Sequence, residues 1–235
     1  MQSVIAAIKY LTLWGRISPT KPTAEAIGGA AVGFPLVGFL FGLMLALIHY
    51  GLGPYLDSEI LSIFLVAVLL VATGGIHLEG SRNTFAALCA VNSPADRPQD
   101  NLWGLVAIVF VILFKTGAIN VIDDKLTLSL LLTPVLARWA LVVFIYGYHD
   151  RCEETPRRIA ENVRFWHLLV TTVAILGLAF YLLGRKGLWI GLALSIVTLL
   201  VRSLLHRRHA VLTHDNFGAV IELGEMLSLI LLASL

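Results

Sequence analysis

The chain has 235 residues, of which 58% are hydrophobic and only 14% charged, and its mean hydropathy is +0.86. An ordinary soluble domain carries about 25% charged residues, so this composition excludes the usual soluble classes. The long uncharged runs also lack the residue-by-residue alternation of a membrane β-barrel. Because a helix satisfies its own backbone hydrogen bonds in lipid, the sequence predicts an all-α, polytopic membrane protein. The net charge is +2. We expect no nucleic-acid partner.

The chain begins with an apolar segment, residues 1–15, around Lys9. This segment is too short to cross a bilayer and has no cleavage site of the kind that ends a signal peptide. It therefore predicts a helix that lies on the membrane surface. We take residues 1–26 as an N-terminal interfacial helix and arm.

Seven apolar stretches follow, each close to the roughly 20 residues that cross the hydrocarbon core. The predicted spans are 27–50, 60–79, 102–122, 126–148, 165–183, 188–205 and 217–235. Residues 27–235 thus form one transmembrane bundle, and 1–235 a single integral membrane domain. Pro35 and Pro134 fall inside the first and fourth spans, where kinks are expected.

The distribution of lysine and arginine predicts the orientation. Of the 17 such residues, only Lys125, Arg185 and Lys186 fall in loops on one side, and Lys115 and Arg138 fall inside spans. All the others lie on the side of the N-terminal arm. Because positively charged loops remain in the cytoplasm, we expect a multi-pass protein of the cytoplasmic (inner) membrane with its N-terminus in the cytoplasm.

Polar residues of other kinds gather at the same predicted face. The second span ends in TGGIHLEGSRN (73–83), and Asp96 and Asp100 precede the third span. The last span reads THDNFGAVIELGEM, in which Asp215, Gly218, Glu222 and Glu225 follow helical spacing and share one stripe. Carboxylates inside a membrane helix are costly unless paired, so we expect them to face the bundle interior near a cation or a metal. The alternative roles are an N-cap for Asp215 and, for the glutamates, a structural ion pair with Arg138.

Several motifs together resemble the cobalamin synthase (adenosylcobinamide-GDP ribazoletransferase) family. The likeness runs through KYLTLWGRISP, GFPLVGFLFGLMLAL, TGGIHLEGSRNTFAAL, TPVLARWALVVFIYGY and LTHDNFGAVIELGEM, and so covers nearly the whole chain. The resemblance implies a membrane phosphotransferase that joins adenosylcobinamide-GDP to α-ribazole or its 5′-phosphate and releases GMP. It also implies Mg²⁺ as cofactor, a corrinoid nucleotide and α-ribazole as substrates, and contact with membrane lipid; homo-oligomerisation stays open.

The resemblance also implies site residues. The expected catalytic residues are His77, Glu79 and Asp215, and the expected metal ligands are Glu79, Asp215 and Asp100. The expected substrate-binding residues are Asn83, Arg138, Thr213, Gly218 and Glu222. We add Arg82, for which the family pattern has no counterpart.

The chain departs from the family pattern at its acidic positions. The family normally reads His-Leu-Asp-Gly-Leu-Ala-Asp-Thr-x-Asp-Gly where this chain reads HLEGSRNTFAA, so three aspartates are replaced by Glu79, Asn83 and Ala86. Three interpretations follow: a divergent synthase, a relative that transfers another activated phosphate to an alcohol, or an inactive corrinoid-binding or scaffold protein of the membrane.

Overall fold

The structure is a computed structural model that describes residues 2–89, 100–123, 125–148, 152–207 and 211–234. Within these ranges the chain is helical and forms no β-strand, apart from an isolated bridge between Cys152 and Leu212. The prediction of an all-α fold is confirmed.

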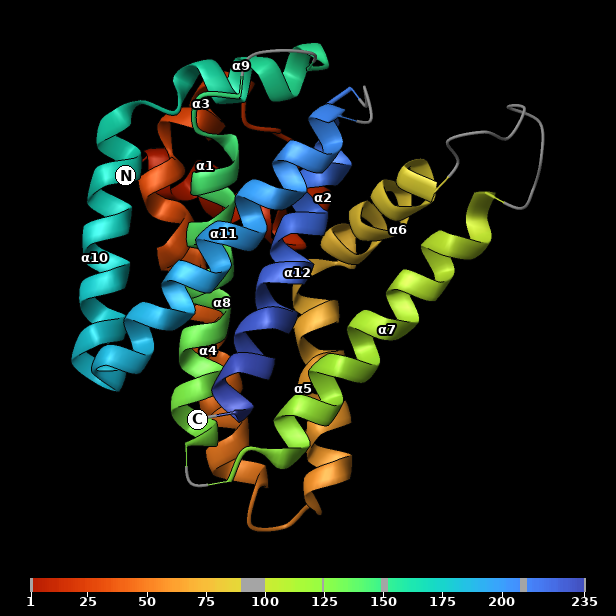
Figure 1. The fold of residues 1–235 in the computed structure, drawn as a ribbon, viewed down its shortest axis with the longest axis vertical. Coiled ribbons are helices and arrows are strands. Elements are labelled where there is room, and N and C mark those ends of the chain that lie inside the picture. Colours follow the sequence, from red (N-terminus) through yellow and green to blue (C-terminus); the bar gives the residue numbers. More distant parts are fainter. Residues whose placement is uncertain (1, 90–99, 124, 149–151, 208–210, 235) are drawn as a thin grey trace.

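The helices form a bundle with smaller helices across one end (Figure 1). The short elements are α1 (Gln2–Leu11), α2 (Trp14–Ile17), α3 (Ala24–Gly29), the 3-10 helix η1 (Ala31–Gly33) and α9 (Glu154–Asn162). The long elements are α4 (Phe34–Leu52), α5 (Ser58–Thr73), α6 (Ile76–Cys89), α7 (Asp100–Val121), α8 (Leu126–Ile145), α10 (Phe165–Leu183), α11 (Arg185–Arg207) and α12 (His214–Ala233).

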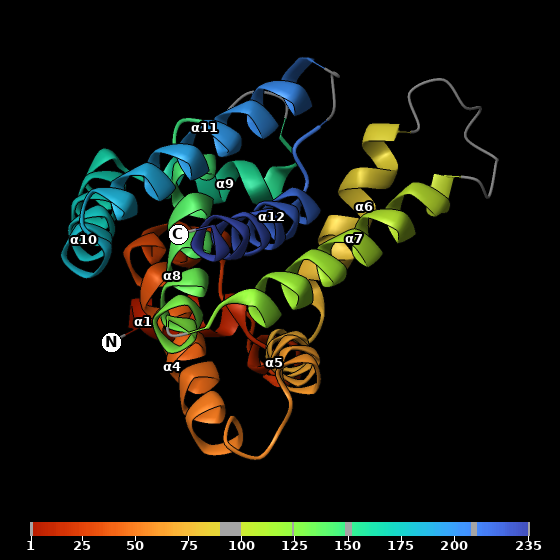
Figure 2. The same cartoon turned by 60° about the horizontal axis from the view of Figure 1, so that its bottom comes forward.

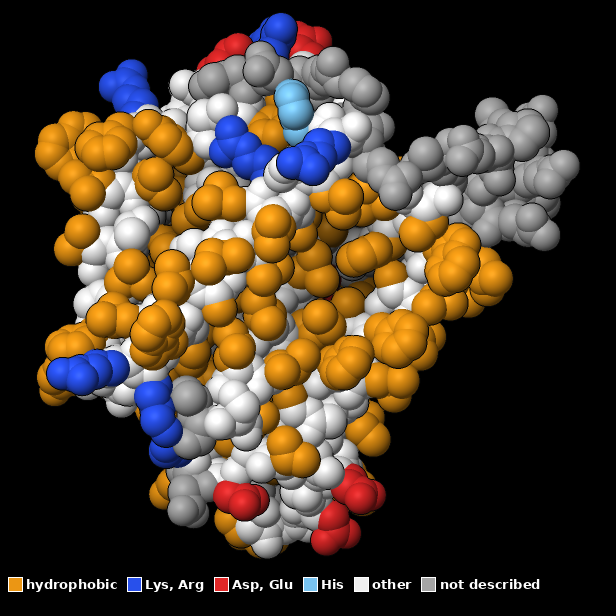
Figure 3. Space-filling view, in the orientation of Figure 1, with side chains coloured by type: hydrophobic (Ala, Val, Ile, Leu, Met, Phe, Trp, Pro, Cys, Tyr) orange, Lys and Arg blue, Asp and Glu red, His pale blue; other side chains and the backbone are white. Residues whose placement is uncertain are grey.

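Six segments of the described chain are long and apolar enough to cross a membrane, and α5 with α6 makes a seventh if that bent pair is one span. The six are α4 with η1, α7, α8, α10, α11 and α12. Hydrophobic side chains cover the middle of the molecule, and charged side chains lie towards its two ends (Figure 3). The prediction of about seven spans is therefore confirmed, whereas the cytoplasmic position of the N-terminus remains a prediction.

The second predicted span, 60–79, is wrong at its end. The helix α5 stops at Thr73, and α6 leaves it at 91°. Gly74 and Gly75 make this turn with φ values of +65° and +67°, a left-handed conformation that other residues adopt at a cost. Hydropathy continues smoothly through Ile76, so the apolar pattern could not reveal the break.

The two prolines behave differently from each other. Pro35 stands in the first turn of α4, where its missing N–H costs no intrahelical hydrogen bond. The expected mid-span interruption there is wrong, because the helix starts at Phe34. Pro134 does lie inside α8, which continues through it to Ile145.

The helix α8 is the centre of the bundle and is buried along most of its length. It packs on α4 through Gly38 and Gly42, where an added Cβ would meet the backbone of Pro134 and Leu131. Small residues four apart let membrane helices approach closely. On its other side α8 packs on α12, which in turn contacts α6 and α7. Figure 2 shows α10 and α11 on one side of this centre and α5, α6 and α7 on the other.

Candidate functional site

The two polar motifs of the sequence meet where α6 crosses the start of α12. Glycines make the crossing close: a Cβ at Gly80 would lie 2.6 Å from the backbone oxygen of Asp215, and one at Gly218 would lie 2.9 Å from that of His77. Gly218, which we predicted to bind substrate, thus has a packing role here. Residues more than a hundred positions apart in the chain are thereby brought together.

A chain of hydrogen bonds crosses this helix pair. Arg82 donates from Nε and Nη2 to Oδ1 of Asn83 at 3.2 and 3.1 Å, and Nδ2 of Asn83 donates to Oδ2 of Asp215 at 3.0 Å. Beside it, Nδ2 of Asn216 donates to Oγ1 of Thr84 at 3.0 Å. The structure therefore brings three of the predicted site residues, Arg82, Asn83 and Asp215, into direct contact.

Glu79 lies on the same helix but faces the N-terminal arm. Its Oε2 accepts a hydrogen bond from Nη2 of Arg16 at 2.8 Å, and both side chains are about half exposed (52% and 50%). Arg16 also donates from Nη1 to the backbone oxygen of Gly74 at 3.2 Å. From the sequence, Arg16 was only one of the positive charges on the predicted cytoplasmic side, although it stands in the motif KYLTLWGRISP.

A small cavity of about 30 Å³ lies beside Asp215. It is lined by Tyr10, Leu11, Ile76, His77, His214, Asp215, Phe217, Gly218 and Ile221. Oη of Tyr10 and Nδ1 of His214 are 3.3 Å apart, and burial raises the pKa of the Tyr10 phenol well above its ordinary value, so Tyr10 is protonated and able to donate to His214. Glu79 does not line this cavity, whereas His77, predicted as catalytic, does.

His77 is buried, and its Nε2 has no hydrogen-bond partner among the described residues. A buried polar atom without a partner is uncommon in a folded protein and points to a missing ligand or water. The imidazole thus lines the same cavity as Asp215 and has one ring nitrogen unused.

Thr213 caps α12. Its backbone N–H donates to Oδ1 of Asn216 at 2.7 Å, which completes a capping box with the Thr213 side chain. The alternative role of Asp215 as N-cap is therefore wrong, because Thr213 holds that position and Asp215 stands in the first turn. The Asp215 carboxylate does not cap the helix and accepts a hydrogen bond from Asn83.

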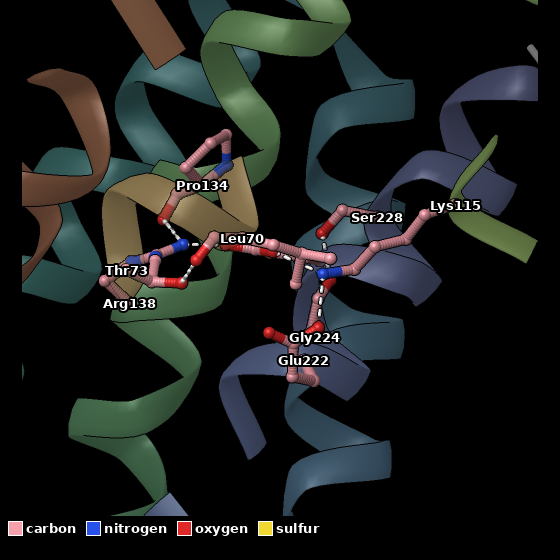
Figure 4. A network of polar contacts seen from close by, with 9 residues as sticks. Leu70, Thr73, Lys115, Pro134, Arg138, Glu222, Gly224 and Ser228 are labelled. Atoms are coloured by element: carbon pink, nitrogen blue, oxygen red, sulfur yellow. Dashed lines mark hydrogen bonds and ion pairs between the residues drawn. The ribbon is translucent and has the colours of Figure 1, made fainter. Parts of the chain in front are cut away.

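Glu222 and Glu225, further along the same stripe of α12, form a buried ion-pair network with Lys115 of α7 and Arg138 of α8 (Figure 4). Nζ of Lys115 lies 2.5 Å from an oxygen of each glutamate, and Arg138 donates to the other oxygen of Glu225. Each of the four side chains is at most 3% exposed. The expectation that these carboxylates face interior cations is confirmed.

This network corrects the placement of two predicted substrate-binding residues. Glu222 lies seven residues from Asp215, about 10 Å along the helix, and Arg138 is fully buried against Glu225. Their partners are Lys115 for Glu222 and Glu225 for Arg138, and neither is hydrogen-bonded to Arg82, Asn83 or Asp215. Their geometry is that of the structural ion pair, in which two positive and two negative side chains are in contact.

The acids present fit only part of a magnesium site. The described residues include no group of three or more His, Cys, Asp or Glu that could hold a metal ion. Of the expected ligands, Glu79 is bonded to Arg16 and Asp215 to Asn83, while the Asp100 side chain and all of Asp96 lie outside the described residues. Mg²⁺ often uses only one or two carboxylates together with substrate phosphates and water. The two described acids, Glu79 and Asp215, are each bonded to a protein donor.

The fold and the site define a polytopic membrane protein with a polar site at one end of its apolar belt. The chain belongs to the cobalamin-5-phosphate synthase family, whose model matches residues 3–233. Similar proteins named adenosylcobinamide-GDP ribazoletransferase occur in Stutzerimonas stutzeri (31% identical, covering 99% of this chain and 98% of the relative) and Clostridium tetani (25% identical, covering 88% and 86%). No solved structure matches the chain. It is thus a membrane transferase of cobalamin biosynthesis.

Proposed function

We propose that this protein joins adenosylcobinamide-GDP to α-ribazole, or to α-ribazole 5′-phosphate, and releases GMP. The observation that carries the proposal is the contact between the two family motifs at α6 and α12, through Arg82, Asn83 and Asp215. Similar proteins that are named for this reaction match the chain over nearly its whole length.

In the proposed reaction, a hydroxyl of α-ribazole attacks the phosphorus that bears the corrinoid. A new P–O bond forms, the bond to the bridging oxygen of the pyrophosphate breaks, and GMP leaves with that oxygen. Negative charge accumulates on phosphate oxygens, so catalysis depends mainly on positioning and electrostatic stabilisation. In this proposal Asp215, which lines one cavity with His77, takes the hydroxyl proton, and Arg82 binds phosphate.

Mg²⁺ is part of the proposal as an ion bound together with the substrate. It would supply further positive charge to the phosphate oxygens, and Glu79 and Asp215 are the described carboxylates that would hold it. Asp100 stays in the proposed ligand set because it begins α7, next to α6.

The proposed location is the inner membrane, with the site on the cytoplasmic face. The supporting observation is that the site lies at the end of the bundle that also carries α1, α3 and α9 (Figure 1). Most lysines and arginines of the sequence belong to the arm and loops predicted on this side. Lipid is expected to contact the apolar belt.

The test is an assay of the purified protein in lipid nanodiscs with adenosylcobinamide-GDP, α-ribazole and Mg²⁺, measuring corrinoid product and GMP together. We expect both products, and a loss of at least about 100-fold in Glu79→Ala and Asp215→Asn, in the range of removing a charged transition-state contact. Arg157→Gln, at an exposed ion pair on α9, is the matched control and should keep its activity. GMP release only with another alcohol would instead favour the second interpretation, and the absence of any turnover the third.

A further inference from the structure

The charged side chains on one face of α6 form a cluster that could bind phosphate. Glu79, Arg82 and Asn83 lie at positions i, i+3 and i+4 of α6, so their side chains share one face of the helix. Arg16 reaches this face from α2 through its ion pair with Glu79. Two arginines and two carboxylates, Glu79 and Asp215, therefore make up the charged part of the cluster.

Both carboxylates are already engaged by protein donors. Glu79 accepts from Arg16, and Asp215 accepts from Asn83, whose own oxygen accepts from Arg82. Each carboxylate is thus linked to one of the two guanidinium groups, Glu79 directly to Arg16 and Asp215 through Asn83 to Arg82. Nη1 of Arg82 makes no hydrogen bond to any described residue and is available to a ligand.

The Arg16–Glu79 pair is easily exchanged. Both side chains are about half exposed, and an exposed ion pair contributes only about 0–1 kcal/mol. A phosphate offers Arg16 a bidentate, charge-assisted partner, which is a stronger one. The planar guanidinium matches phosphate better than the point charge of lysine does.

Packing also holds Arg82 in place. A Cβ at Gly104 of α7 would lie 2.5 Å from the backbone oxygen of Arg82 and 2.8 Å from its Cγ, so α7 leaves room for this stem only because residue 104 is glycine. The stem of Arg82 is therefore packed between α6 and α7, and its guanidinium donates to Asn83.

We propose that Arg16 and Arg82 together bind the pyrophosphate group of the substrate directly, before and without any divalent ion. Arg16 leaves Glu79 for one phosphate, and Arg82, held by Asn83, binds the other. Glu79 is then a competitor of the phosphate in the resting state. This inference rests on the proposed function only in taking the substrate to carry a pyrophosphate.

The experiment is a calorimetric titration of the full-length protein with inorganic pyrophosphate, in nanodiscs of zwitterionic phosphatidylcholine with EDTA present. We expect saturable binding that weakens at least about tenfold in Arg16→Gln and in Arg82→Gln, because a hydrogen bond to a charged group contributes roughly 1.5–3 kcal/mol. Arg157→Gln removes the same charge from an exposed ion pair and should change the affinity by less than about twofold. Arg16→Lys and Arg82→Lys, checked for thermal stability, should bind with intermediate affinity.

Glu79→Gln distinguishes this inference from metal-first binding by the sign of its effect. It should strengthen pyrophosphate binding in EDTA severalfold, because the competing carboxylate is gone. Binding that requires added Mg²⁺, arginine variants no weaker than Arg157→Gln, or weaker binding in Glu79→Gln would each overturn the inference. Pyrophosphate binding as described without any corrinoid product would contradict only the proposed function, and product formation with arginine-independent pyrophosphate binding would contradict only this inference.

Discussion

At the scale of single residues, the amide of Asn83 determines what the cluster can hold. An aspartate at this position would face Asp215 across 3.0 Å, and the present arrangement exists because the amide donates a hydrogen bond there. The same amide accepts from Arg82 through its oxygen. One neutral side chain thus links a cation to an anion.

This arrangement predicts an effect of Asn83→Asp on stability. Two carboxylates at this distance repel each other and the donated hydrogen bond is lost, so unfolding should become easier by about 1–3 kcal/mol in EDTA. A divalent ion between the two carboxylates should restore the loss. The measurement is thermal unfolding in detergent with EDTA or with Mg²⁺, on wild type and variant. A variant with the wild-type midpoint in EDTA would show that Asn83 and Asp215 do not meet as described.

Sequence reasoning succeeded at this scale where periodicity carries the information. Helical spacing placed Asp215, Gly218, Glu222 and Glu225 on one stripe, and the cost of charge in lipid placed the glutamates on interior cations. It missed Arg16, because nothing local shows that the N-terminal arm folds back onto residue 79. A contact across 63 positions depends on tertiary packing, which a single motif does not encode.

At the scale of elements, glycines determine where the helices meet. The spans themselves were predictable because only helices satisfy their backbone groups in lipid. The turn at Gly74 and Gly75 was not, because a positive φ leaves no trace in hydropathy. After α6 turns away from α5, Gly80 lets its backbone pack directly against the backbone of α12 at Asp215.

Gly80→Ala should separate the two motifs. The added methyl would lie 2.6 Å from the Asp215 backbone oxygen, so α12 must shift, at a cost of about 1–3 kcal/mol and with loss of GMP release. Gly117→Ala, in α7 with nothing within 4 Å, is the matched control and should be neutral or slightly stabilising. Thermal midpoints and turnover of both variants check this. Equal activity in the two variants would argue against the close crossing.

The buried network joins α7, α8 and α12 and supports a second prediction about elements. Lys115→Met removes the ion-pair partner of Glu222 and leaves Glu225 with Arg138 alone, and breaking a buried pair on one side costs about 3–5 kcal/mol. Adding Glu222→Gln restores the balance of charge, so the double variant should recover at least about half of that loss. The free energy of unfolding of the single and double variants, as a double-mutant cycle, measures the coupling. Purely additive losses would mean that Lys115 and Glu222 do not interact.

At the scale of the whole molecule, charge and hydropathy agree on one arrangement. The apolar belt separates two ends, and the polar site lies at the end that carries the N-terminal helices (Figures 1 and 3). The side of the membrane on which each loop lies could be predicted, because successive membrane-spanning helices run in opposite directions. Which end faces the cytoplasm rests on the charge rule alone.

The orientation can be tested by labelling introduced cysteines from outside intact cells with a membrane-impermeant maleimide. In a background with Cys89→Ser and Cys152→Ser, we expect Asp57→Cys and Arg185→Cys to react. Both positions are exposed, at the starts of α5 and α11, and these helix starts lie away from α9 (Figure 1). Arg157→Cys, exposed on α9, should react only after the membrane is made permeable. Because these positions report on opposite ends of one bundle, reaction in the reverse order would place the site of Asp215 and Glu79 outside the cell. A nucleotide-activated substrate made in the cytoplasm could not then reach it, so the reverse order would contradict the proposed function as well as the orientation.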